Sequence, residues 1–64
     1  MKYYLIPTIA VDKLHSLYIR AKNETEAVER IYNFFDGKAQ LLNIKRIKKA
    51  TYEYITRINR ELKV

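Results

Sequence analysis

The sequence predicts a small α+β domain in which three or four antiparallel strands form a sheet with one helix on one face. Three observations lead to this prediction. Two strand-like segments come first, a capped amphipathic helix follows, and the last third is rich in β-branched and aromatic residues. The element order is then ββαβ or ββαββ. A chain of 64 residues has the size of one small domain, so we expect residues 1–64 to form a single unit.

The first segment, Met1 to Val11, is rich in Tyr, Leu, Ile, Thr and Val, which suit a pleated, half-buried strand. Its odd and even positions are both largely apolar, so both faces of the strand would be covered. Pro7 has no N–H to donate to a neighbouring strand, which favours an edge position or a bulge. Two interpretations stay open. The strand offers a free edge to a second copy or a target protein, or the C-terminal segment folds over its second face.

A hairpin connection at Asp12 to His15 would lead into a second strand, Ser16 to Lys22, in which apolar and polar residues alternate. The alternation predicts that Leu17, Ile19 and Ala21 face the core. This segment and the first one would form an antiparallel pair.

A helix is predicted between Asn23 and Gly37, and both of its ends carry local signals. Asn23 is a good N-cap, and Glu26 stands three residues later, where a capping-box partner belongs. The apolar side chains then repeat at helical spacing; they are Ala27, Val28, Ile31, Phe34 and Phe35. Gly37 can adopt the left-handed backbone that ends many helices.

The segment after Gly37 fits two different structures. Leu41 to Lys48 and Thr51 to Ile58 are rich in β-branched and aromatic residues, so we favour strands for both. A helix is the alternative, because several apolar side chains fall close to one stripe at helical spacing. These are Ile44, Ile47, Thr51, Ile55, Ile58 and Leu62. The polar stretch Asn59 to Val64 is expected to fray.

The stretch Tyr18-Ile-Arg-Ala-Lys-Asn-Glu-Thr-Glu-Ala-Val-Glu-Arg-Ile ends a strand in Ala, caps a helix with Asn and opens that helix with Glu-x-Glu-Ala. With the leading strand and the trailing basic strand, it resembles the DpnD/PcfM-like domains of phages and plasmids. The resemblance covers residues 3–48. It implies a ββαβ fold and an origin in a mobile element, and it carries no catalytic residues over to this chain.

Charge is distributed unevenly along the chain. Residues 1–37 hold five basic and five acidic side chains, whereas residues 38–64 hold eight basic and two acidic ones. The whole net charge of +6 therefore lies in the last 27 residues. Such a concentration raises the local potential more than scattered charges do, and contacts with phosphates would make use of it.

We predict that this last third binds nucleic acid or an acidic protein surface. The candidate residues are Lys45, Arg46, Lys48, Lys49, Tyr52, Tyr54, Arg57 and Arg60. The tyrosines could stack on bases, with Tyr18 as a further candidate on the open face of the sheet, or they could be half-buried packing residues. The protein would be a phage- or plasmid-type accessory or regulatory protein. The alternative is an inhibitor or adaptor of a host or defence protein that uses the same basic face or the first strand.

Composition argues against catalysis, cofactors, metals and membrane spans. Histidine occurs once, at His15, and cysteine is absent, so a metal site would lack its usual ligands. Ser16 and His15 are neighbours on a strand and point to opposite faces, so they form no nucleophile–base pair. The apolar stretch Tyr3 to Val11 is far shorter than the roughly 20 residues of a spanning helix. We expect a cytoplasmic binding protein that is not an enzyme and needs no cofactor.

Overall fold

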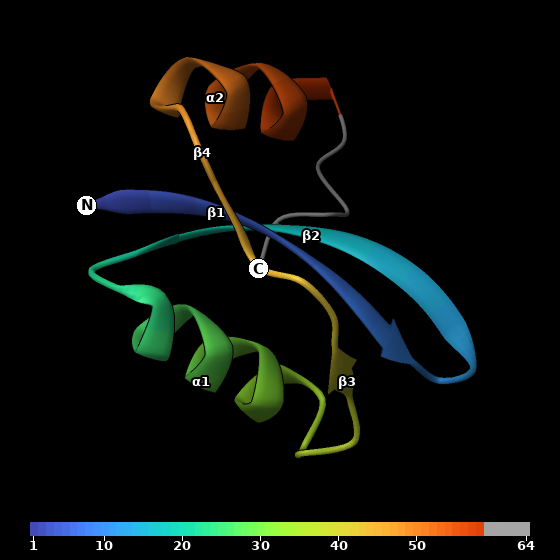
Figure 1. Ribbon diagram of the computed structural model, residues 1–64. Helices are drawn as coiled ribbons and strands as arrows, with labels where there is room; N and C mark the ends of the chain where they lie inside the picture. Colours follow the sequence, from blue (N-terminus) through green and yellow to red (C-terminus); the bar gives the residue numbers. More distant parts are fainter. Residues whose placement is uncertain (59–64) are drawn as a thin grey trace.

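The structure, a computed structural model, describes residues 1–58 and contains an antiparallel sheet flanked by two helices (Figure 1). The elements in chain order are β1 (Lys2–Ala10), β2 (Lys13–Ala21), α1 (Glu24–Phe34), β3 (Gln40–Leu41), β4 (Lys45–Ile47) and α2 (Lys49–Ile58). The predicted α+β class is therefore confirmed, with one helix more than the sequence led us to expect. Within these residues no helix is long and apolar enough to cross a membrane.

The β1–β2 hairpin is closed by a two-residue loop. Ala10 pairs with Lys13, and the ladder continues without interruption to the pair of Lys2 with Ala21. Val11 and Asp12 both have positive φ, 52° and 59°, as a type I′ turn requires. The loop is shorter than the predicted connection, so the second strand begins earlier than Ser16. No Asn-Gly pair marks this turn in the sequence, which explains the difference.

Strand β1 lies in the centre of the sheet, with β2 on one side and both β3 and β4 on the other. The expectation that the first strand offers a free edge is therefore wrong, because both of its edges are occupied. Pro7 marks a bulge instead. The register of β4 (Leu5 opposite Lys45) and that of β3 (Thr8 opposite Leu41) differ by one residue, so the three residues 42–44 stand opposite only Ile6 and Pro7 of β1.

The position of Pro7 explains why β3 and β4, which lie along the same side of β1, are two short strands and not one continuous strand. Leu42 N–H donates to the Pro7 carbonyl at 2.8 Å, so the backbone of β1 at Pro7 faces the segment that joins β3 to β4. A reciprocal bond cannot form, because proline has no N–H. The sequence left an edge and a bulge as alternatives, and the bulge is what the chain adopts.

The core lies between the sheet and α1. On this face the buried residues are Tyr4, Ile6, Leu17, Ile19 and Ala21 from the sheet and Ala27 and Ile31 from the helix. The predicted inward set of the second strand is thus confirmed. The Asn23 side chain accepts a hydrogen bond from Glu26 N–H at 2.8 Å, as expected of an N-cap.

The end of α1 adopts a Schellman motif. Gly37 N–H donates to the Tyr32 carbonyl at 2.7 Å, and Asp36 N–H donates to the Asn33 carbonyl at 3.4 Å. Asp36 and Gly37 both have positive φ, 52° and 77°. The predicted end of the helix at Gly37 is therefore confirmed, and both Asp36 and Gly37 adopt the left-handed backbone conformation there.

The strand favoured for Thr51 to Ile58 is wrong, because residues 49–58 form helix α2. The interpretation of Leu41 to Lys48 as a strand holds in part, as the short strands β3 and β4. Helix α2 buries Tyr52, whose ring lies 4.9 Å from that of Tyr3 between centroids.

Tyr3 and Tyr4 are neighbours on β1 and so point to opposite faces of the sheet. Helix α2, which packs on Tyr3, therefore lies across the sheet from α1, which packs on Tyr4 (Figure 1). This confirms the alternative in which the C-terminal segment covers the second face of the first strand. The cover is partial, because Ile9 and Leu14 at the far end of the hairpin are exposed.

Candidate functional site

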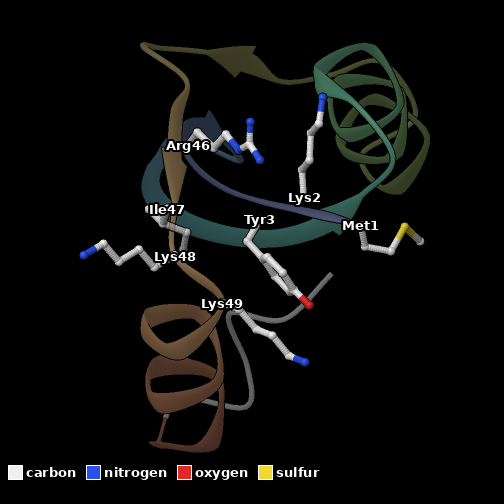
Figure 2. A pocket seen from close by; sticks show the side chains of 7 residues that line it. All are labelled: Met1, Lys2, Tyr3, Arg46, Ile47, Lys48 and Lys49. Carbon is white, nitrogen blue, oxygen red and sulfur yellow. The ribbon is translucent and has the colours of Figure 1, made fainter.

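A hollow of about 780 Å³ lies where the start of β1, the end of β4 and the start of α2 meet. Its lining residues are Met1, Lys2, Tyr3, Arg46, Ile47, Lys48 and Lys49 (Figure 2). Four of these seven side chains are cationic, and none is a carboxylate. The hollow is therefore a place where a negatively charged group would meet several positive charges.

The pairing of the short strand β4 with β1 determines which faces of the sheet these cations occupy. In the β4 register, Arg46 lies opposite Tyr4, and Ile47 lies opposite Tyr3. Arg46 and Lys2 consequently share the face of the sheet on which α1 packs, whereas Ile47 and Tyr3 lie on the face of α2 (Figure 2). The hollow is therefore lined from both faces of the sheet. Lys48 connects β4 to α2 directly, without a longer loop that would carry the next cation away.

The first turn of α2 contributes a further positive potential. The free N–H groups at the start of a helix carry the positive end of the helix dipole. Acidic side chains are absent from the first turn of α2, and Lys48 and Lys49 occupy this end instead. Like charges at this place cost about 0.3–1 kcal/mol each, a cost that a bound anion would relieve.

A second hollow, of about 460 Å³, adjoins the first and shares Tyr3 and Lys49 with it. Its other lining residues are Arg20, Tyr52, Glu53, Thr56 and Arg57. Arg20 comes from β2, where it lies opposite Tyr3 in the ladder. Taken together, the cations of the two hollows define what we call the basic surface: Lys2, Arg20, Arg46, Lys48, Lys49 and Arg57.

The basic surface is poorly neutralised by the rest of the described chain. Among residues 1–58 the ion pair within 4 Å joins Arg30 to Glu26, at 3.5 Å, and neither residue belongs to the surface. Glu53 is the one carboxylate that lines the two hollows. The two hollows together are thus lined by six cations and one acidic side chain.

Five of the eight residues predicted for the site line the two hollows, four of them as cations and Tyr52 as an aromatic side chain. Arg46, Lys48, Lys49 and Arg57 belong to the basic surface. Lys45 lies opposite Leu5 in the sheet and lines neither hollow. Arg60 falls outside the described residues.

The two predicted tyrosines differ from each other. Tyr52 is 8% exposed, and its ring packs on Tyr3, so the expectation that it offers a ring face to a base needs correction. It is a packing residue, as the alternative interpretation had it. Tyr54 is 64% exposed but lines neither hollow. Aromatic stacking on the basic surface therefore has little support among the described residues.

Lys2 and Arg20 belong to the basic surface although neither was predicted for the site. Both come from the first 37 residues, where basic and acidic side chains balance. A partial signal existed for Arg20, because a hairpin between the first two strands must place it near the chain start. The missing information was that α2 folds back over this end of the sheet.

No group of three or more potential metal ligands occurs among the described residues. His15 lies with its Nε2 atom 3.2 Å from the Ala10 carbonyl oxygen, and its ring neighbours that of Phe35 at 6.0 Å between centroids. These contacts place His15 at the hairpin, away from both hollows.

Comparison with known proteins identifies no relatives: no family model, no curated protein and no solved structure matches this chain.

Proposed function

We propose that this protein binds nucleic acid through the basic surface, as a small accessory or regulatory protein of the kind that phages and plasmids encode. The observation that carries the proposal is the convergence of six cations from four elements of the fold around two joined hollows with one lining carboxylate. Cations that line joined hollows repel one another, and a bound polyanion would offset that repulsion.

Phosphate groups are the part of the nucleic acid that this surface fits. Each phosphate met by a lysine or arginine releases counterions, and this release drives association at low salt. The first turn of α2 adds backbone N–H groups to the lysines at the same place. Lys48 and Lys49 are therefore the residues on which we expect binding to depend most.

The contact is expected to be with the sugar–phosphate backbone rather than with the bases. Stacking requires an aromatic ring with an open face among the cations, and the Tyr3 and Tyr52 rings are packed on each other. Contacts to phosphates carry no sequence information of their own. We therefore expect similar affinities for nucleic acids of different sequence.

The proposal is tested by measuring the binding of the whole chain to single- and double-stranded DNA and RNA by fluorescence anisotropy. We expect micromolar binding at low salt, weakening steeply between 50 and 200 mM salt, as about three to five phosphate contacts would produce. Absence of binding to all four nucleic acids at low salt would overturn it. That result would favour the alternative, an inhibitor or adaptor that docks the same cations on an acidic protein surface.

A further inference from the structure

The outer edge of β2 is a second surface of interest, which shares Arg20 with the basic surface. Strand β2 pairs with β1 over its whole length, and within residues 1–58 no strand pairs with its other edge. Most natural proteins cover or shorten such an edge, because its free N–H and C=O groups can pair with another strand. An edge of nine residues is long enough to be recognised in this way.

The hairpin fixes which residues present their backbone groups at this edge. Ala10 and Lys13 flank the two-residue loop, and such flanking residues form a hydrogen-bonded pair in this type of hairpin. Hydrogen-bonded and non-bonded pairs then alternate along the ladder. The backbone groups that point outward consequently belong to Leu14, Ser16, Tyr18 and Arg20.

One end of this edge is already occupied by the protein itself. Arg30 of α1 donates from its Nη1 atom to the Arg20 carbonyl at 2.7 Å. The Arg30 side chain is held in place by its ion pair with Glu26. Helix α1 thus closes the edge at Arg20 and leaves open the stretch from Leu14 to Tyr18.

The open stretch is complementary to a second copy of itself. Pairing two copies in antiparallel orientation with Ser16 opposite Ser16 places Leu14 opposite Tyr18 of the second copy. This register needs no backbone group of Arg20 and places no like charges directly opposite each other in the open stretch. Registers shifted toward the end of β2 would need the Arg20 carbonyl, which Arg30 occupies.

Two further observations favour this register. Leu14 is 67% exposed, and pairing with a tyrosine would shield it from water, which stabilises cross-strand contacts. In the same register, Asp12 in the hairpin loop of one copy lies opposite Arg20 of the second copy. These charges are opposite in sign, so they would favour this alignment.

We propose that the open edge of β2 is the docking site for a second copy of this chain, giving a two-fold symmetric dimer with one continuous sheet. The two-fold axis of an antiparallel strand pair is perpendicular to the sheet, so corresponding faces stay on the same side. Both copies of α2 therefore lie on one side of the extended sheet. Two basic surfaces in a fixed relation would bind one polyanion more tightly than one surface does.

The proposal is tested by sedimentation equilibrium of the full chain together with two variants of Ser16. Ser16→Pro removes the central outward N–H, which takes no part in the β1–β2 ladder, and proline is tolerated on edge strands. Ser16→Ala keeps the N–H and is the matched control. We expect a concentration-dependent dimer for the natural chain and for Ser16→Ala, and a dissociation constant at least about tenfold higher for Ser16→Pro.

Leu14→Lys gives a second variant in case Ser16→Pro disturbs the hairpin, because Leu14 is exposed and a lysine at an edge discourages pairing. We expect it to weaken the dimer while the far-ultraviolet circular dichroism stays unchanged. A natural chain that remains monomeric up to about 1 mM would overturn the proposal. So would a dimer that Ser16→Pro and Leu14→Lys both leave intact.

Discussion

The two helices of this protein begin in opposite ways. Helix α1 starts with an asparagine cap and has Glu24 and Glu26 in its first turn. Helix α2 starts at Lys49, directly after Lys48, and has no acidic residue in its first turn. In α1 the Asn23 side chain and two carboxylates offset the positive end of the helix dipole. In α2 two lysines stand at the positive end of the dipole, so like charges lie next to each other.

The two helices also differ in how they are anchored. Helix α1 buries Ala27 and Ile31 in the main core. Helix α2 buries one residue, Tyr52, on the opposite face of the sheet. Helix α1 thus contributes to the main core, whereas α2 contributes mainly cations that line the two hollows.

The largest effect is expected from the anchor of α1. Replacing Ile31, which is fully buried, with alanine removes core contacts and leaves a cavity. We expect the free energy of unfolding to fall by about 2–5 kcal/mol, a large share of what so small a domain has. Urea denaturation followed by circular dichroism measures this loss, and a change below about 1 kcal/mol would contradict the assignment of the main core to α1.

A smaller loss is expected from the anchor of α2. Tyr52→Ala removes the ring that packs on Tyr3 and should lower the free energy of unfolding by about 1–3 kcal/mol. Tyr54→Ala is the matched control on the same helix, where the side chain is 64% exposed. We expect it to change stability by less than about 0.5 kcal/mol. Equal losses for the two variants would mean that α2 is not anchored as described.

The N-cap of α1 should contribute to the free energy of unfolding about as much as one hydrogen bond does. Asn23→Ala removes the acceptor of the Glu26 N–H, and we expect a loss of about 0.5–2 kcal/mol. Asn23→Asp keeps an acceptor oxygen and should retain most of the stability. The same denaturation assay distinguishes them, and a loss in both would point to a role of the amide nitrogen instead.

Substitutions at the start of α2 should raise the stability of the protein, in contrast to the three losses above. Lys48→Glu with Lys49→Glu replaces two cations by anions at the positive end of the helix dipole. We expect the double variant to unfold at a slightly higher temperature, with a gain of about 0.5–1 kcal/mol. A lower melting temperature would contradict the assignment of the two lysines to unfavourable positions at the positive end of the α2 dipole.

The sequence was most informative where the signals are local. The cap at Asn23, the alternation from Leu17 to Ala21 and the glycine after α1 depend on near neighbours along the chain. The structure follows each of them. The fold class could be inferred from these elements alone, because a hairpin and one amphipathic helix already define an α+β arrangement.

The remaining features depend on contacts between distant residues. The segment around Tyr52 has the composition of a strand but also a helical repeat of apolar side chains, and it forms a helix in which Tyr52 packs on Tyr3. Arg20 reaches the basic surface because it lies opposite Tyr3, on the face of the sheet where α2 packs, whereas Lys2 lines the first hollow from the other face. The central position of β1 could not be read from Pro7, which fits an edge and a bulge equally well.

The most direct test of the account compares two charge reversals of equal size in a nucleic-acid binding assay. Lys48→Glu with Lys49→Glu reverses charge on the basic surface, and Lys13→Glu with Lys38→Glu reverses the same charge at residues that line neither hollow. We predict that the first pair weakens binding by at least about 100-fold and flattens the salt dependence, while the second pair changes affinity by less than about tenfold. Equal losses for the two pairs would contradict the account, because they would show that overall charge, and not the basic surface, governs binding.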